Sequence, residues 1–213
     1  FYQDIAQEPE GRTIYWGHAV SDDLIHWHDL PRAIYPGPEA ECWSGATWVE
    51  DDRVIAMYFG YGPGEGGIMV AESRDPLLLN WRKLGGGPVI SPGDGLAGYR
   101  VYDPCIWREP DGYYALSGRF GAHPETGRRV RKEFVFRSED LVHWEYLHPF
   151  VEGEEFGAAG QDGACPYFLP ISDRHILLHY NHMGMPQYVI GRYDKERHLL
   201  IPHNQGQFSH VAN

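Results

Sequence analysis

The sequence repeats one phrase three times: SDDLIHW at residues 21–27, SRDPLLLNW at residues 73–81 and SEDLVHW at residues 138–144. Each copy follows a short apolar run, and the copies lie roughly fifty to sixty-five residues apart. Repeats of this length that are built from strands and turns are typical of a β-propeller, in which each repeat forms one blade. The pattern therefore predicts an all-β fold.

The stretches between the copies support this interpretation. Apolar residues at helical spacing are nearly absent, whereas short β-rich runs alternate with turn residues. Hairpins are predicted over residues 43–61, 105–117 and 167–180. The phrase falls after the third strand of each repeat, where its Asp can bond backbone amides. We interpret its tryptophans and recurring histidines as structural residues: Trp27, Trp81, Trp144, His26 and His143.

Counted in this way, the chain holds roughly three and a half blades of a larger propeller, since a closed propeller needs at least four. We expect residues 1–213 to form a single, partial propeller domain. The chain opens on Phe1-Tyr2-Gln3, without an initiator Met and inside a predicted strand. We therefore expect that the natural N-terminus is missing, which leaves the cellular compartment open.

Composition excludes several classes of function. The formal net charge of −12 provides no basic surface for phosphates, so we expect no nucleic-acid partner. No apolar run approaches membrane-spanning length, so we expect no membrane partner. The three cysteines have neither zinc spacing nor a disulfide framework. We expect them to be buried free thiols, and we expect neither a metal site nor a cofactor.

Candidate chemistry lies where the first strand of each repeat begins, because these strands line the channel of a propeller enzyme. The places present here are Trp43-Ser44-Gly45, Tyr102-Asp103-Pro104 and Gly163-Ala164-Cys165-Pro166. Asp103 stands directly before a proline at a predicted strand start. Its local sequence fits a site carboxylate and an ordinary turn aspartate equally well.

Several of these segments resemble glycoside hydrolase family 32, the β-fructosidases. The resemblance begins with Phe1-Tyr2-Gln3 and the block from Trp16 to Ser21, which reads WGHAVS. It continues with a Phe-Ser-Gly segment, an Arg-Asp-Pro motif and a Glu-Cys-Pro motif of the family. Their counterparts are Trp43-Ser44-Gly45, Tyr102-Asp103-Pro104 and Ala164-Cys165-Pro166.

The resemblance implies a five-bladed propeller and a retaining glycosidase that acts on β-fructosides. In such an enzyme one carboxylate attacks the anomeric carbon and a second, about 5 Å away, acts as acid and then as base. By position, Asp103 inherits the role of transition-state stabiliser. The resemblance also implies that the fructosyl unit contacts a further set of residues: Gln3, Trp43, Ser44, Tyr102 and Cys165.

The sequence departs from the family pattern at three places. The motif that carries the nucleophile, Trp-Asn-Asp-Pro-Asn-Gly, is expected before Phe1. Tyr102 replaces an arginine and removes a bidentate donor. Ala164 stands where the acid/base glutamate belongs, and alanine cannot transfer a proton. We therefore expect this chain to be inactive on its own.

Another carboxylate can be considered for the missing acid. Asp162 precedes Ala164 by two residues, so both side chains share a face if the strand extends back that far. The segment from Gly160 to Gly163 reads equally well as a surface turn. Glu154 and Glu155 in the preceding loop are further candidates.

These observations predict a glycosidase of the β-fructosidase type whose partner is a carbohydrate. One alternative is an arabinosidase or xylosidase on a related five-bladed propeller, which Tyr102 and Ala164 leave open. A second is a propeller that lost its acid/base but still binds sugars, which Ala164 favours. A panel of nitrophenyl glycosides distinguishes the first alternative from a β-fructosidase. Calorimetry with fructosides tests the second alternative, because it detects binding without hydrolysis.

Overall fold

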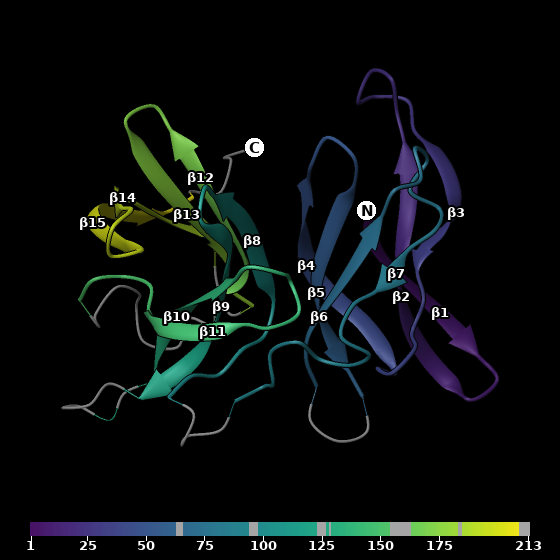
Figure 1. The fold of residues 1–213 in the computed structure, drawn as a ribbon, viewed down its shortest axis with the longest axis horizontal. Coiled ribbons are helices and arrows are strands. Elements are labelled where there is room, and N and C mark those ends of the chain that lie inside the picture. Colours follow the sequence, from purple (N-terminus) through teal and green to yellow (C-terminus); the bar gives the residue numbers. More distant parts are fainter. Residues whose placement is uncertain are drawn as a thin grey trace. The chain divides into compact units, whose positions relative to one another are not determined.

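The structure, a computed structural model, describes residues 1–62, 66–93, 98–122, 127, 129–153, 163–182 and 185–208. Over these ranges the chain forms fifteen β-strands and no helix. The described strands assemble into four antiparallel sheets, which Figure 1 labels strand by strand. The chain divides into two compact units, Phe1–Pro92 and Gly93–Asn213.

The first unit contains a three-stranded and a four-stranded sheet, each with its strands in sequence order. The first sheet consists of β1 (Tyr2–Glu8), β2 (Gly11–Val20) and β3 (His28–Ile34). The second consists of β4 (Glu41–Val49), β5 (Val54–Tyr61), β6 (Gly67–Ser73) and β7 (Arg82–Lys83). The hairpin predicted over residues 43–61 is confirmed as β4 and β5.

The second unit contains two four-stranded sheets, also in sequence order along each sheet. The first consists of β8 (Pro104–Glu109), β9 (Gly112–Ala122), β10 (Arg129–Ser138) and β11 (Glu145–Pro149). The second consists of β12 (Ala164–Ile171), β13 (Arg174–Tyr180), β14 (Gln187–Asp194) and β15 (Leu199–Gln207). The sequence did not predict β15, because its second half is polar and carries no strand pattern.

The repeated phrase folds into the same turn in its first and third copies. In the first, Ser21 Oγ accepts the amide of Leu24 at 2.8 Å and Asp23 Oδ1 accepts the amide of His26 at 2.8 Å. The third copy forms the equivalent bonds at 2.9 and 2.8 Å. The leucine of every copy adopts positive φ: 61° at Leu24, 54° at Leu78 and 70° at Leu141.

The rest of the phrase completes this turn. The indole of each tryptophan donates to the carbonyl of the leucine three residues earlier, and the last strand of the sheet begins at the next residue. The Nδ1 atom of His26 lies 2.7 Å from the carboxylate of Asp23, and the Nδ1 atom of His143 lies 2.7 Å from that of Asp140. The interpretation of these tryptophans and histidines as structural residues is confirmed.

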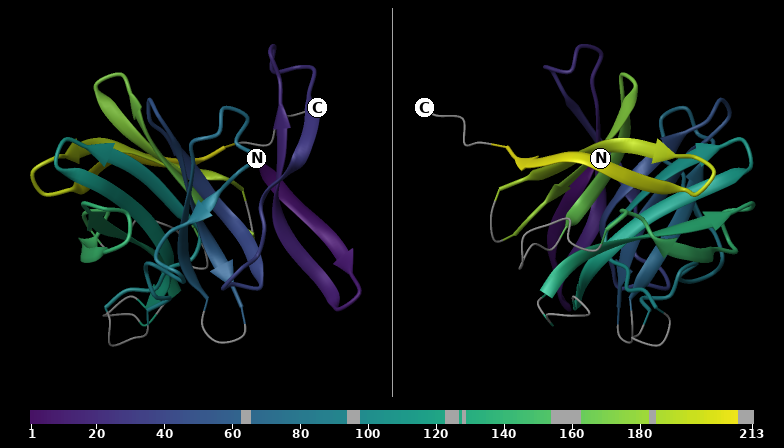
Figure 2. Two further views of the ribbon diagram at one scale, coloured as in Figure 1. Left: turned by 45° about the vertical axis from the view of Figure 1, so that its right-hand side comes forward. Right: turned by 90° about the vertical axis from the view of Figure 1, so that its left-hand side faces the viewer.

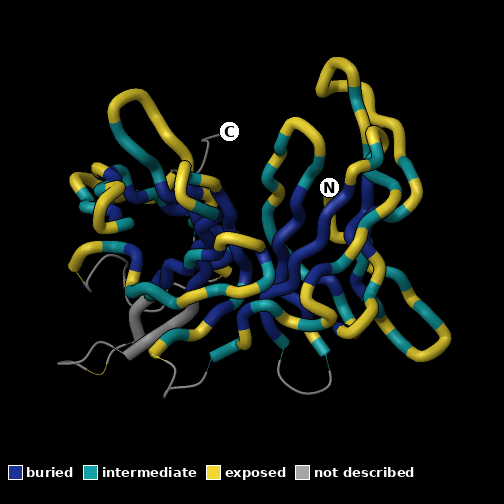
Figure 3. Tube along the Cα trace, in the orientation of Figure 1, coloured by how far each residue is buried: buried dark blue, intermediate teal, exposed yellow. Residues whose placement is uncertain are grey.

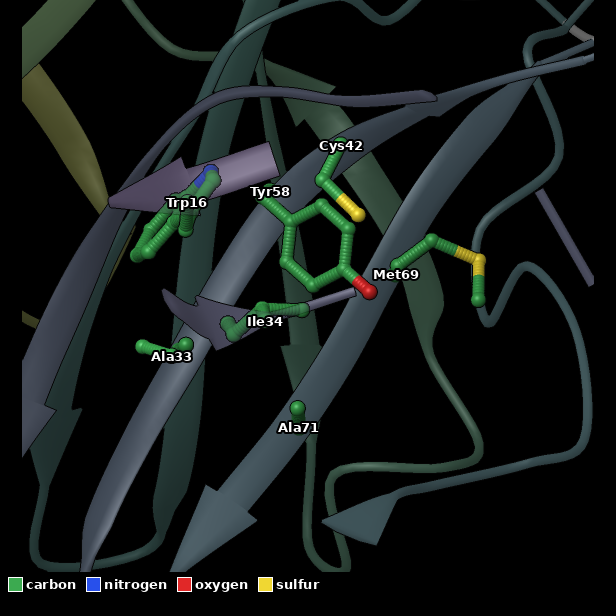
Figure 4. Close-up of a cluster of buried hydrophobic side chains, with 8 residues drawn as sticks. Trp16, Ala33, Ile34, Cys42, Tyr58, Met69 and Ala71 are labelled. Carbon is green, nitrogen blue, oxygen red and sulfur yellow. The ribbon is translucent and has the colours of Figure 1, made fainter. Parts of the chain in front are cut away.

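The core of the first unit is built on β5 and β6, which form a dark band of buried residues in Figure 3. Figure 4 shows Trp16, Ile34, Cys42, Tyr58 and Met69 gathered in this core. The rings of Trp16 and Tyr58 lie 5.6 Å apart, so β2 of the first sheet packs on β5 of the second. Strands of both sheets therefore share one hydrophobic cluster.

Figure 2 shows the two sheets of the second unit from further directions. These sheets pack on each other through aromatic side chains. Phe168 on β12 lies 5.2 Å from the ring of Trp107 on β8. At the edge of this contact, His198 Nε2 lies 3.0 Å from the hydroxyl of Tyr114 and His198 Nδ1 lies 3.3 Å from that of Tyr193. Since Tyr114 donates its proton to Asp111, the Nε2–H of His198 donates to Tyr114 and Nδ1 accepts from Tyr193.

Candidate functional site

In the first unit, two predicted site residues from different sheets lie side by side. The side-chain amide of Gln3 on β1 donates to Ser44 Oγ on β4 at 3.2 Å. Gln3 is exposed and Ser44 is half-buried, so neither residue is enclosed in the core. The structure thus brings together two of the three first-unit residues that the resemblance implies in sugar binding.

The third, Trp43, precedes Ser44 in an irregular part of β4. The register between β4 and β5 shifts between Cys42 and Gly45, which makes Trp43 and Ser44 a β-bulge. A bulge bends the strand and redirects its side chains, and such bulges are common beside active sites. The sequence placed Trp43 and Ser44 at a strand start but did not predict the bulge.

The bulge is held from several sides. The indole of Trp16 donates to the carbonyl of Trp43 at 2.7 Å, and the indole of Trp43 donates to Glu41 Oε2 at 2.7 Å. A Cβ on Gly45 would lie 2.1 Å from the carbonyl oxygen of Met57, so only glycine fits the close approach of β4 to β5. The position of Trp43 is therefore fixed by backbone contacts as well as by its ring.

In the second unit, Asp103 is a buried carboxylate directly before β8, with 4% of its surface exposed. Its Oδ2 accepts the amide of Cys165 at 3.0 Å and lies 3.4 Å from the Cys165 thiol. The predicted pair Asp103 and Cys165, sixty-two positions apart, is thus joined directly. An ordinary turn aspartate bonds its own turn, so this cross-sheet contact favours the site interpretation of Asp103.

The backbone around Cys165 is unusual. Cys165 adopts φ of 48° and Gly163 adopts φ of 61°, and the register of β12 shifts between Ala164 and Tyr167. A cysteine at positive φ is uncommon and carries strain, which the bonds to Asp103 help to offset. β12 thus resembles β4: each is the first strand of its sheet, with an irregularity near its start.

Tyr102, the remaining predicted residue, is fixed through its backbone. Its amide donates to Ser117 Oγ at 2.9 Å, and that hydroxyl donates to the carbonyl of Tyr102 at 3.0 Å. Ser117 lies on β9, opposite Pro104 of β8. The clamp fixes the chain entering β8, and so the approach to Asp103.

The candidate acids lie outside the described residues, namely Asp162, Glu154 and Glu155. Ala164 itself begins β12 and is buried. Among the described residues, no three His, Cys, Asp or Glu side chains form a group that could hold a metal ion. No helix in the described part of the chain is long and apolar enough to cross a membrane.

The cysteines occupy two kinds of environment. Cys42 and Cys105 are buried free thiols, as the sequence predicts, and burial raises the pKa of Cys105 to about 11. Cys165 is also a free thiol, but it is only partly buried, so the prediction of burial was wrong for this residue.

Comparisons with known proteins settle the family. A family model described as the glycosyl hydrolases family 32 N-terminal domain matches residues 1–211. The chain belongs to glycoside hydrolase family 32. This family 32 chain is 33% identical to the β-fructofuranosidase insoluble isoenzyme CWINV6 of Arabidopsis thaliana, over 92% of this chain and 39% of the relative.

Solved structures of the family agree. The Bombyx mori GH32 β-fructofuranosidase BmSUC1 superposes with a TM-score of 0.73 at 28% identity, over 91% of this chain and 43% of that enzyme. A mutant of the same enzyme in complex with sucrose gives a TM-score of 0.70 at 29% identity, over 88% and 41% of the two chains. The predicted fold class, part of an all-β propeller, is confirmed. The chain spans between about a quarter and two fifths of the length of the curated relatives that it matches.

Sequence reasoning missed one group of buried polar residues beside the bulge in this family 32 chain. Glu39, Tyr58 and Lys83 converge next to Cys42. A charged residue in a Pro- and Gly-containing segment reads as a solvated loop, so neither Glu39 nor Lys83 stood out. Gly37 leaves space for the side chain of Lys83, and Gly60 leaves space for that of Glu39. These contacts indicate the group, but they can be recognised only in the folded structure.

Proposed function

We propose that the full-length protein hydrolyses β-fructosides with retention of configuration, and that this chain supplies fructosyl-binding residues and the transition-state stabiliser. Family membership supports the reaction class, and the sucrose complex of the BmSUC1 mutant supports the substrate class. The observation that carries the proposal is the buried Asp103 carboxylate, which Cys165 holds at the start of β8.

In this proposal Asp103 does not bond covalently to the sugar. A retaining glycosidase passes through an oxocarbenium-like transition state, in which positive charge develops on the sugar ring. A fixed carboxylate that accepts hydrogen bonds from sugar hydroxyls stabilises that charge more than it stabilises the neutral substrate. The N–H and S–H of Cys165 fix one oxygen of Asp103, so it does not reorganise during the reaction.

Gln3, Trp43 and Ser44 are proposed to bind the fructosyl unit. Gln3 and Ser44 offer a donor and an acceptor already in hydrogen-bonding contact, a pair that a sugar hydroxyl can bridge. Trp43 provides an indole face with a fixed backbone. We also propose Asp162 as the acid/base, and Asp162→Asn in the full-length protein should lower kcat for sucrose because an amide cannot transfer the proton.

The test substitutes Asp103→Asn in the full-length protein and measures hydrolysis of sucrose and of inulin-type sugars. The amide keeps the shape of the side chain but removes its charge. We expect kcat to fall on the order of 10²-fold or more, with an unchanged far-UV spectrum. Asp173→Asn, in the exposed turn between β12 and β13, is the matched control and should leave kcat unchanged. Full activity of Asp103→Asn would refute the assignment.

Ala164 favours a second candidate function, a sugar-binding propeller without hydrolysis, because a methyl group stands where the family has its acid/base. Calorimetry with fructosides on the full-length protein separates the two. Binding accompanied by product supports the glycosidase, whereas binding with no product after long incubation supports the binding protein. Nitrophenyl arabinosides and xylosides in the same assay test the third candidate, a related propeller glycosidase.

A further inference from the structure

A buried carboxylate in the first unit collects hydrogen bonds from three strands. Glu39 lies in the segment that joins β3 to β4, and only 3% of its side chain is exposed. Its Oε1 accepts the hydroxyl of Tyr58 on β5 at 2.7 Å and the thiol of Cys42 on β4 at 3.3 Å. The ammonium of Lys83 on β7 donates to the same oxygen. Figure 4 shows the Tyr58 hydroxyl and the Cys42 sulfur on the same side of the core.

The charges of this group compensate each other. Burial raises the pKa of Glu39, but the hydrogen bonds from Lys83 and Tyr58 outweigh it and hold the pKa below its usual value. Glu39 is therefore an anion paired with Lys83, whose side chain is 19% exposed. Removing either partner of such a pair leaves an uncompensated charge in a poorly solvated place.

The geometry leaves little room for these side chains to move. A Cβ on Gly60 would lie 3.0 Å from Glu39 Cβ, and a Cβ on Gly37 would lie 3.2 Å from Lys83 Nζ. Within the described residues, Glu39 Oε2 is buried and accepts no hydrogen bond. The hydrogen bonds from Cys42, Tyr58 and Lys83 therefore all go to Oε1. The ion pair is thus confined by glycines and fixed at one oxygen.

This group is joined in sequence to the sugar-binding bulge. Cys42, which donates to Glu39, is the residue directly before Trp43 and Ser44. Across the bulge, the backbone of β4 is tied to Trp16 through the Trp43 carbonyl. The bulge is therefore held by the Glu39 group on one side and by Trp16 on the other, and a shift of Cys42 would move Ser44 relative to Gln3.

We propose that Glu39 and Lys83 are positioning residues for carbohydrate binding, which set the geometry of the Trp43–Ser44 bulge without touching the sugar. This inference rests on the proposed function of Trp43 and Ser44. It assigns a role to the ion pair of buried Glu39 and half-buried Lys83, which the proposed chemistry does not use. A bulge that loses this support samples other positions, and the loss should affect binding of substrate more than the chemical step.

The kinetic test uses Glu39→Gln and Lys83→Met in the full-length protein with sucrose as substrate. We expect KM to rise on the order of tenfold while kcat changes by less than about twofold. The double variant Glu39→Gln/Lys83→Met removes both charges and should fold better than Lys83→Met alone, because no unpaired anion remains buried. An unchanged KM in a folded Glu39→Gln protein would overturn the proposal.

The same sheet provides a matched control. Glu72 on β6 is also buried and pairs with Arg53 at 2.7 Å, but its strand position is far along the sheet from the bulge. Glu72→Gln should lower the melting temperature about as much as Glu39→Gln, yet leave KM unchanged. Equal increases of KM in both variants would show a general effect of destabilisation and would refute a positioning role.

A readout without sugar separates this inference from the proposed function. Hydrogen exchange of peptides covering residues 41–47 should become on the order of tenfold faster in Glu39→Gln than in wild type, and Glu72→Gln should leave it unchanged. A wild-type protein that neither binds nor cleaves fructosides would refute the proposed function, whereas the exchange result still decides whether Glu39 supports the bulge. Unchanged exchange in Glu39→Gln would refute the support itself.

Discussion

Single side chains in this protein matter mainly where the backbone approaches closely or turns sharply. Asp103 illustrates what the sequence can reveal: the Asp-Pro pair predicts a strand start, which β8 confirms, and the structure adds the bonds of Asp103 to Cys165. Glu39 illustrates the opposite case. Its burial depends on Lys83 and Tyr58, which lie far from it in sequence and join it only through the fold.

Gly45 offers a direct test of the bulge. A Cβ at this position would lie 2.1 Å from the carbonyl oxygen of Met57 and 2.6 Å from Tyr58 Cα, and backbone atoms cannot step aside as a flexible side chain can. Gly45→Ala should therefore lower the unfolding free energy by about 3 kcal/mol, measured by urea denaturation. Gly87→Ala is the control, since a Cβ at Gly87 meets nothing within 4 Å. Equal stabilities of the two variants would contradict the packing of β4 on β5.

The sequence predicted the strands and turns well wherever the repeated phrase occurs. Ser, Asp and Trp of the phrase each satisfy a specific backbone or side-chain group in the turn, so the pattern is readable without tertiary information. β15 and the bulges of β4 and β12 were not predicted. A strand of polar residues and an extra residue in a strand both depend on the neighbouring strand, which local sequence does not contain.

The phrase also permits a comparison of one backbone conformation in two environments. Leu24 and Leu141 share positive φ, but Leu24 is 77% exposed and Leu141 is 1% exposed. Leu24→Gly should raise stability by up to about 1 kcal/mol, because glycine removes the left-handed strain and little burial is lost. Leu141→Gly should lower stability by about 3 kcal/mol, because a buried side chain is deleted. Thermal unfolding of both variants checks this, and changes of the same sign would contradict it.

At the level of the full chain, family 32 membership and the propeller fold agree with the repeats, whereas a single domain over residues 1–213 stays a prediction. The sequence predicted strand starts near Trp43, Asp103 and Cys165, and β4, β8 and β12 begin there, whereas the roles of these residues stay predictions. The family motif did not predict the acid/base, because Ala164 occupies its position and a carboxylate in that role must come from another part of the chain.

Protonation of the half-buried imidazole of His198 should make the fold sensitive to mild acid. Burial lowers the pKa of His198, and Asp111 and Glu109 only partly oppose this effect. An unfolded histidine binds its proton near pH 6.5, so the stabilising effect of the neutral ring is fully present above that pH and is lost as the pH falls below it. The unfolding free energy from urea titrations should therefore decrease between pH 7.5 and 5.5.

His198→Gln isolates this effect. Glutamine can still bond to Tyr114 but does not titrate, so the variant should lose less stability than wild type over the same pH interval. A His198→Gln protein with the wild-type pH dependence would contradict the assignment to His198.

The bulges of β4 and β12 have a consequence for how this protein can diversify. Each holds its residues through main-chain contacts: the Trp43 carbonyl bonds to Trp16, and the Cys165 amide bonds to Asp103. Hydrogen bonds made by the main chain of a residue are retained when its side chain is replaced. The residues at positions 43, 44 and 164 can therefore be exchanged by mutation while the backbone that presents them is preserved, so a library randomised at these positions should yield mostly folded variants.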